Sequence, residues 1–119
     1  MDPYAADKDF VRSVAESSAT EVHLGKIAQE KASSDTVKAF GKQIVAADTQ
    51  TGQQLLQAAA VLKIDLPAKP PRKARKDGER LAKLSGPDFD HAYARMAADQ
   101  QEQAVKEFER EAKEESRRP

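Results

Sequence analysis

Residues 7–32 read DKDFVRSVAESSATEVHLGKIAQEKA, and this stretch decides the fold class. Its apolar side chains recur at steps of three and four, which places them on one face of an α-helix. Asp7 can accept hydrogen bonds from the free amides of a first turn, so we expect it to be the N-cap of a helix that runs to about residue 32. The face of this helix carries Phe10, Val14, Ser17, Glu21, Leu24 and Ala28.

A second long helix is predicted from about residue 36 to about 63. Ser33-Ser34-Asp35 interrupts the first pattern and offers a cap, and so short a connection makes the two helices antiparallel neighbours. The prolines at 67, 70 and 71 end the second helix, because proline lacks an amide hydrogen. The face of this helix carries Val37, Gly41, Ile44, Asp48, Thr51, Leu55, Ala58 and Leu62.

A third long helix begins at residues 85–88, which read SGPD. Serine or glycine can cap, proline suits the first turn, and the acidic residues that follow complement the helix dipole. This helix runs to about residue 115, and its face carries Phe89, Tyr93, Met96, Gln100, Ala104 and Phe108. The sequence therefore predicts one all-α domain over residues 7–115, with three long antiparallel helices and a basic crossover over residues 66–84. Within the crossover, residues 73–84 can form a short helix.

Two glycines interrupt the second helix. Gly41 and Gly52 each cost a helix about 1 kcal/mol relative to alanine. Close approach of a neighbouring helix would account for them, and so would loose packing.

Composition excludes several classes of protein. A chain of 119 residues fits one domain, and a charged fraction of 34% with no tryptophan is typical of long helices. Twenty basic and twenty acidic residues cancel, so we expect no nucleic-acid partner. No run approaches the roughly 20 apolar residues of a membrane span. The first residues lack the pattern of a signal peptide, so the chain is either cytoplasmic or an exported protein without its leader.

The helical faces bring polar residues to one level. Glu21 and Asp48 lie at similar heights on antiparallel helices, and Gln100 can join them from the third helix. Buried carboxylates are costly unless they bind a cation, share a proton or accept hydrogen bonds. The layer is therefore a divalent metal site, a proton-sharing pair, or a hydrated polar layer that fixes the helix register.

Three blocks of sequence resemble a known family. Residues 20–28 (TEVHLGKIA), 37–41 (VKAFG) and 84–93 (LSGPDFDHAY) are similar, in that order, to the bacterial ferritin-like family called domain of unknown function 4142. The resemblance implies a ferritin-like helical bundle and an exported, often periplasmic, protein. It implies no established activity.

The sequence departs from the pattern of that family at the polar layer. The family carries Asp-His pairs on its second and third long helices, whereas this chain reads Asp48-Thr49 and Asp99-Gln100. The candidate metal ligands that remain are Glu21, Asp48, Gln100 and Asp99, a set that favours weakly held Mg²⁺ or Ca²⁺. The two histidines, at positions 23 and 91, fall off the inward faces, so we expect both to be exposed surface residues.

The resemblance also implies a fourth helix, which this sequence does not contain. Three helices of a four-helix bundle leave an apolar groove, which a partner or a second copy tends to fill. We expect a homodimer, which could exchange the third long helix through the crossover.

The remaining charge cluster lies in the crossover. Residues 69–83 hold seven basic residues against two acidic ones, a surplus of five. Arg72, Lys73, Arg75 and Lys76 could bind an anion, but a solvated, flexible loop is the favoured interpretation. No catalytic signature is visible. The sequence therefore favours a non-enzymatic protein that acts by protein contacts in the cell envelope or stress response, with metal or anion binding as the alternatives and no cofactor expected.

Overall fold

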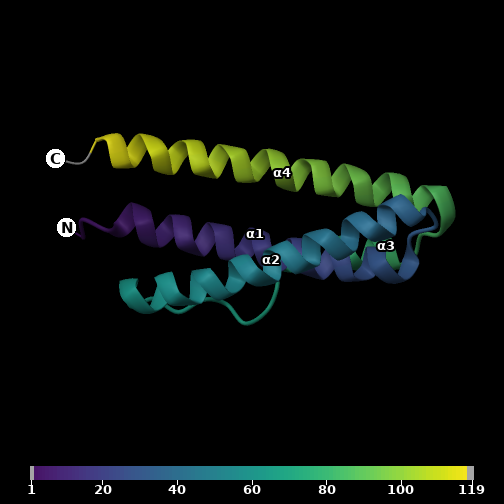
Figure 1. Cartoon of the computed structure of the whole chain (residues 1–119), viewed down its shortest axis with the longest axis horizontal. Helices are drawn as coiled ribbons and strands as arrows, with labels where there is room; N and C mark the ends of the chain where they lie inside the picture. Colours follow the sequence, from purple (N-terminus) through teal and green to yellow (C-terminus); the bar gives the residue numbers. More distant parts are fainter. Residues whose placement is uncertain (1, 118–119) are drawn as a thin grey trace.

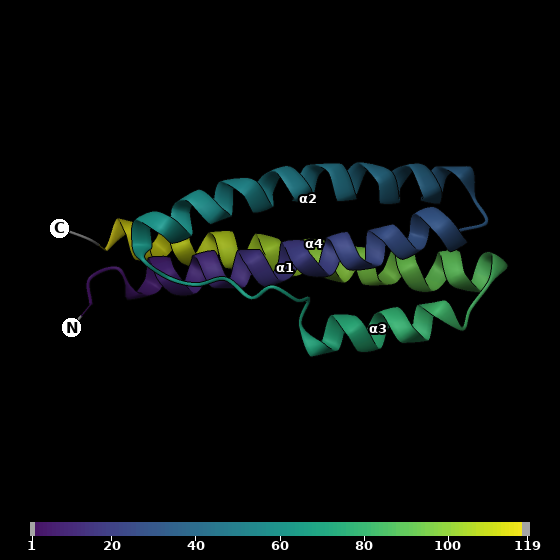
Figure 2. The same ribbon diagram turned by 90° about the horizontal axis from the view of Figure 1, so that it is seen from below.

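The computed structural model describes residues 2–117, which form four helices and no strand. The helices are α1 (Ala5–Lys31), α2 (Asp35–Leu62), α3 (Arg72–Ala82) and α4 (Gly86–Ser116). The all-α class is confirmed, and the crossover contains the short helix α3, which spans residues 72–82 where residues 73–84 were predicted. The molecule is elongated, with extents of 52 × 25 × 22 Å. Helix α1 is central, because α2, α3 and α4 all pack against it (Figures 1 and 2).

The short 32–34 link makes α1 and α2 antiparallel, and the two helices approach most closely at a pair of glycines. A Cβ atom added to Gly41 would lie 3.0 Å from the carbonyl oxygen of Gly25, and one added to Gly25 would lie 2.8 Å from Cγ2 of Ile44. Close approach therefore accounts for Gly41. It does not account for Gly52, where a Cβ atom would meet no described atom within 4 Å.

The ends of the helices differ in part from the expectation. Helix α1 begins at Ala5, so the prediction of Asp7 as its N-cap is wrong. Asp7 instead lies in the first turn, where its charge complements the helix dipole. Ser34 does cap α2, since its hydroxyl accepts a hydrogen bond of 3.4 Å from the amide of Val37.

A carboxylate of α4 strengthens the start of α2. Asp90 accepts hydrogen bonds from the amide (3.0 Å) and hydroxyl (2.7 Å) of Ser33, and from the amide of Ser34 (3.0 Å). These hydrogen bonds hold the pKa of Asp90 below its usual value, with the charge of His91 as a smaller cause. One side chain thus fastens α4 to the α1–α2 turn.

We expect Asp90→Ala to lower the thermal unfolding midpoint by several degrees, because three donors lose their acceptor at once. Asp88→Ala, two residues earlier on an exposed position of the same turn, is the matched control and should change the midpoint less. Circular dichroism melts of both variants test this. Equal melts would show that the Asp90 contacts add nothing to stability.

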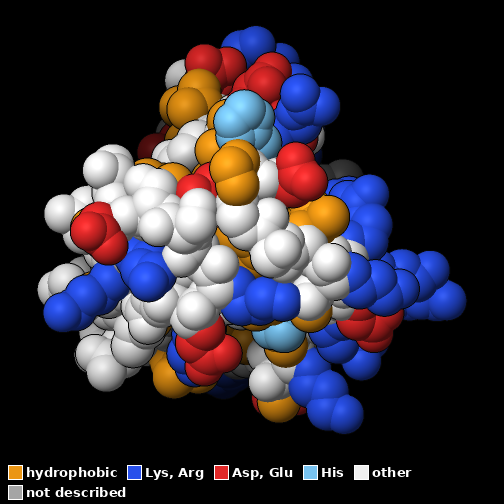
Figure 3. Space-filling view, turned by 90° about the vertical axis from the view of Figure 1, so that its right-hand side faces the viewer, with side chains coloured by type: hydrophobic (Ala, Val, Ile, Leu, Met, Phe, Trp, Pro, Cys, Tyr) orange, Lys and Arg blue, Asp and Glu red, His pale blue; other side chains and the backbone are white. Residues whose placement is uncertain are grey.

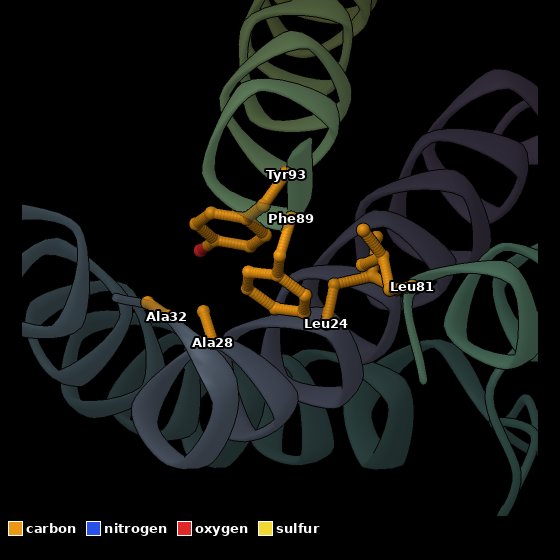
Figure 4. Close-up of a cluster of buried hydrophobic side chains, with 6 residues drawn as sticks. All are labelled: Leu24, Ala28, Ala32, Leu81, Phe89 and Tyr93. Carbon is orange, nitrogen blue, oxygen red and sulfur yellow. The ribbon is translucent and has the colours of Figure 1, made fainter. Parts of the chain in front are cut away.

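The hydrophobic core gathers at the end of the molecule where α3 and the start of α4 meet α1. Figure 4 shows Phe89 and Tyr93 of α4 pointing toward α1, with Leu81 of α3 beside them. Phe89 and Leu81 are fully buried. The interpretation of the crossover as a solvated loop is therefore wrong over residues 72–82, because Leu81 anchors a helix there. The buried core consists of Leu24, Ala28, Ala32, Leu81, Phe89 and Tyr93.

Candidate functional site: a carboxylate pair between two hollows

Glu21 of α1 and Asp48 of α2 are neighbours in the middle of the bundle, as the helical faces predict. The hydroxyl of Ser18, a buried residue, donates a hydrogen bond of 3.2 Å to Oδ1 of Asp48. Oδ2 of Asp48 is also buried, and no donor among the described residues satisfies it while Glu21 is ionised. An unsatisfied buried oxygen is costly, so a proton on Glu21 would be favoured.

The ionisation of Glu21 reflects this arrangement. Burial raises the pKa of Glu21 to about 8, and its hydrogen bond with Asp48 and the negative charge of Asp48 act in the same direction. A neutral Glu21 carboxyl can donate the hydrogen bond that Oδ2 of Asp48 lacks. The raised pKa of Glu21 therefore favours one proton between the two side chains.

Helix α4 closes the layer from the other side. Tyr93 and Gln100 line, together with Glu21, a cavity of about 10 Å³, which has room for at most one water molecule. Burial, together with the charges of Glu21 and Asp48, raises the pKa of Tyr93 to about 12. Gln100 therefore joins the layer, whereas Asp99 is exposed on α4 and does not line this cavity.

The donor set does not fit the metal centre that a ferritin-like fold implies. Residues 2–117 contain no group of three or more His, Asp or Glu side chains that could hold a metal ion. Transition-metal pairs in such bundles use several carboxylates together with imidazoles. Here two carboxylates share a layer with a tyrosine and an amide, so the layer does not fit such a metal pair.

The two histidines differ in their surroundings. His91 is exposed, as predicted. His23 is half-buried, because α3 lies over it: a Cβ atom added to Gly78 would sit 2.7 Å from Nε2 of His23. The expectation that His23 is a free surface residue is wrong, since the sequence alone does not place α3 on α1.

The basic residues of the crossover lie mainly on α3. Figure 3 shows Lys and Arg side chains gathered on the side of the molecule where α3 lies. Lys73 (2.8 Å) and Arg80 (2.9 Å) form ion pairs with Asp77, which neutralise part of this charge. Arg72, Arg75 and Lys76 are exposed, so they remain the candidate anion contacts.

An apolar groove separates α2 from α4. The two helices run parallel to each other and antiparallel to α1 (Figure 1), and the rings of Phe40 and Tyr93 meet across the groove at a centroid distance of 6.2 Å. The groove has a volume of about 380 Å³. Phe40 is 40% exposed in it. Its walls consist of Thr36, Val37, Phe40, Tyr93, Ala94, Ala97, Ala98 and Gln101.

A second hollow lies on the opposite side of the carboxylate pair, beneath the segment 66–70 that leads from α2 to α3. This cleft has a volume of about 510 Å³ and is lined by α1, α2 and the crossover. Asp48 and Ser18 contribute polar atoms to it, and Leu55, Leu56 and Leu66 contribute apolar ones. No periodic pattern in the sequence indicates this cleft, because one of its walls is an irregular segment.

Fold and site together define a class: an all-α protein in which the carboxyl groups of Glu21 and Asp48 lie between an apolar groove and a mixed cleft. The chain matches the family described as Domain of unknown function (DUF4142) over residues 2–119, and it belongs to that family. Neither the curated proteins nor the solved structures contain a match to this chain. Among residues 2–117, no helix is both long and apolar enough to cross a membrane.

Proposed function

We propose that this chain is a non-enzymatic, ferritin-like helical domain that acts through protein contacts and forms a homodimer by way of the groove between α2 and α4. The observation that carries the proposal is that groove, with Phe40 partly exposed on one wall and an alanine-rich wall on the other. Apolar surface of this kind is usually covered in a functional assembly. The resemblance to exported bacterial proteins supports a role in the cell envelope.

The directions of the helices favour a second copy of α4 as the occupant of the groove. Because α2 and α4 run in the same direction, a single helix that lies between them can be antiparallel to both (Figure 1). Together with α1, it would complete a four-helix bundle with opposed helix dipoles. In a twofold dimer, each α4 takes this place in the partner.

The residues along α4 support one register for that contact. Ala94, Ala98, Gln101, Val105 and Phe108 recur at steps of four and three, which is the spacing of a coiled-coil face. Val105 is 56% and Phe108 is 58% exposed, and one edge of the Phe108 ring contacts Phe10 of α1 at a centroid distance of 5.2 Å.

An antiparallel pairing of two α4 helices would set Phe108 of one copy opposite Ala98 of the other, and Val105 opposite Gln101. The large Phe108 side chain then faces the small Ala98, and the branched Val105 faces the unbranched Gln101. The same register brings Arg95 near Glu109 of the second copy, a pair of opposite charges.

Light scattering after size exclusion tests the proposal. We expect the mass of a dimer at tens of micromolar, and the mass of a folded monomer for Ala98→Glu and Phe108→Glu, because a charge would be buried in the contact. Leu56→Glu is the control, since Leu56 is 63% exposed but lies on the cleft side of α2. A wild-type monomer, or a dimer that survives both glutamates, would contradict the proposal.

A further inference from the structure

The cleft beneath residues 66–70 has the size and lining of a small-molecule site. Its volume of about 510 Å³ lies within the range of ligand pockets, roughly 300–1,000 Å³. Leu56 is 63% exposed on its wall, beside Leu55 and Leu66. A ligand with an apolar body would cover this surface.

The charge at the base of the cleft indicates the polar end of such a ligand. Asp48 lines the cleft and is half-buried: Oδ2 is buried beside Glu21, whereas Oδ1 accepts one hydrogen bond from Ser18 and keeps a second lone pair. A cationic N–H donor would give this carboxylate a charge-assisted hydrogen bond in a partly desolvated place. Lys26 stands at the rim and is exposed, so its charge is directed largely to solvent.

Gly52 supplies an independent observation. It lies mid-helix on the cleft wall, where glycine costs about 1 kcal/mol relative to alanine, yet a Cβ atom there would meet no described atom within 4 Å. Helix packing therefore does not require glycine at this position. Its effect is to leave the cleft open beside Asp48.

We propose that the cleft between α1, α2 and residues 66–70 binds an organic ammonium ion, with Asp48 accepting from the ammonium group and Leu55, Leu56 and Leu66 contacting the apolar chain. The cleft and the groove share no lining residue, so this site does not depend on the homodimer. Binding is reversible and involves no covalent step.

Three probes of equal length separate the contributions of charge and apolar contact: hexylammonium, hexanol and hexanoate, each titrated against the full chain by isothermal calorimetry and amide NMR. We expect hexylammonium to bind about tenfold more tightly than hexanol, the difference that a hydrogen bond to a charged group gives. Hexanoate should bind most weakly. Perturbed amide signals should cluster around residues 48–56 and 66–70.

Variants then test the assigned residues. Asp48→Asn should weaken hexylammonium about tenfold and leave hexanol nearly unchanged, whereas Gly52→Leu should weaken both by filling the cleft. Asp99→Asn, an exposed carboxylate on α4, is the control and should change neither. A melt of each variant verifies folding.

Three results would overturn the proposal. One is hexanoate binding as tightly as hexylammonium, which would assign the cleft to anions through Lys26. Another is hexylammonium binding that Asp48→Asn does not weaken. The last is the absence of saturable hexylammonium binding by the folded wild-type chain.

Discussion

Replacing Glu21 with glutamine is expected to make the stability of the protein nearly independent of pH between 5 and 9, whereas the wild type should lose stability over the same range. The cause is the raised pKa of Glu21, about 8 in the folded chain against 4.5 for the ordinary side chain. Below pH 4.5, Glu21 is protonated in both the folded and the unfolded states. As pH rises, the unfolded state releases this proton first, so stability falls until the folded state also releases it near pH 8.

The partial exposure of Glu21 limits the size of this change in stability with pH. A shift of one pKa unit corresponds to about 1.4 kcal/mol, but Glu21 is only half-buried, and solvent screens part of its interaction. We therefore expect the free energy of unfolding to fall by about 2 kcal/mol from pH 5 to pH 9 in the wild type. Glutamine stays neutral and can still donate a hydrogen bond to Asp48, so the variant should be the more stable protein at pH 9.

Urea unfolding at several pH values, at one protein concentration, measures this difference. Glu16→Gln, an exposed glutamate on the same helix, serves as the matched control and should keep the wild-type slope. If Glu21→Gln and the wild type show parallel pH profiles, the two carboxyl groups do not share a proton.

Two glycine-to-alanine substitutions in α2 should change stability in opposite directions. Gly41→Ala places a methyl group 3.0 Å from the carbonyl oxygen of Gly25 and 3.1 Å from Cβ of Ala28, so α1 and α2 must separate. Overpacking of this kind costs about 1–3 kcal/mol, against a gain of about 1 kcal/mol in helix propensity. We expect a net loss at Gly41.

The methyl group added by Gly52→Ala would lie in open space instead. The free energy of unfolding should therefore rise by the full gain in helix propensity, up to about 1 kcal/mol. The two variants carry the same chemical change in one helix, and each is therefore the control for the other. Thermal and urea unfolding give the comparison. A stabilising Gly41→Ala would show that the helices do not depend on this close contact.

The helices themselves follow from local sequence. The spacing of apolar residues places the three long helices, and serine and proline mark the starts of α2 and α4, because these signals act within one turn. The start of α1 lies two residues before the predicted cap, since Asp7 is as favourable in the first turn as at the cap. The contact of Asp90 with Ser33 and Ser34 was not predictable, because it joins residues more than fifty positions apart.

The polar layer was also predictable from local sequence, but its surroundings were not. Helical periodicity brings Glu21, Asp48 and Gln100 to one level, since level depends only on rise per residue. The hydroxyl that holds Asp48 belongs to Ser18, which lies three residues before Glu21 and could have been identified from that spacing. The burial of His23 and the cleft could not, because both depend on how α3 and the irregular segment 63–71 fold back onto α1.

The absence of cysteine from the sequence allows one direct test of the homodimer through α4. An equimolar mixture of Ala98→Cys and Phe108→Cys chains is oxidised mildly, and the disulfide-linked products are identified by mass spectrometry. A disulfide requires Cα atoms within about 7 Å, which the antiparallel register provides between positions 98 and 108 of different copies. Two copies of position 98 lie about 15 Å apart along the helix. We predict the mixed 98–108 dimer as the main product, with little linkage in either chain alone; equal linkage of all three kinds, or none, would contradict the proposed dimer.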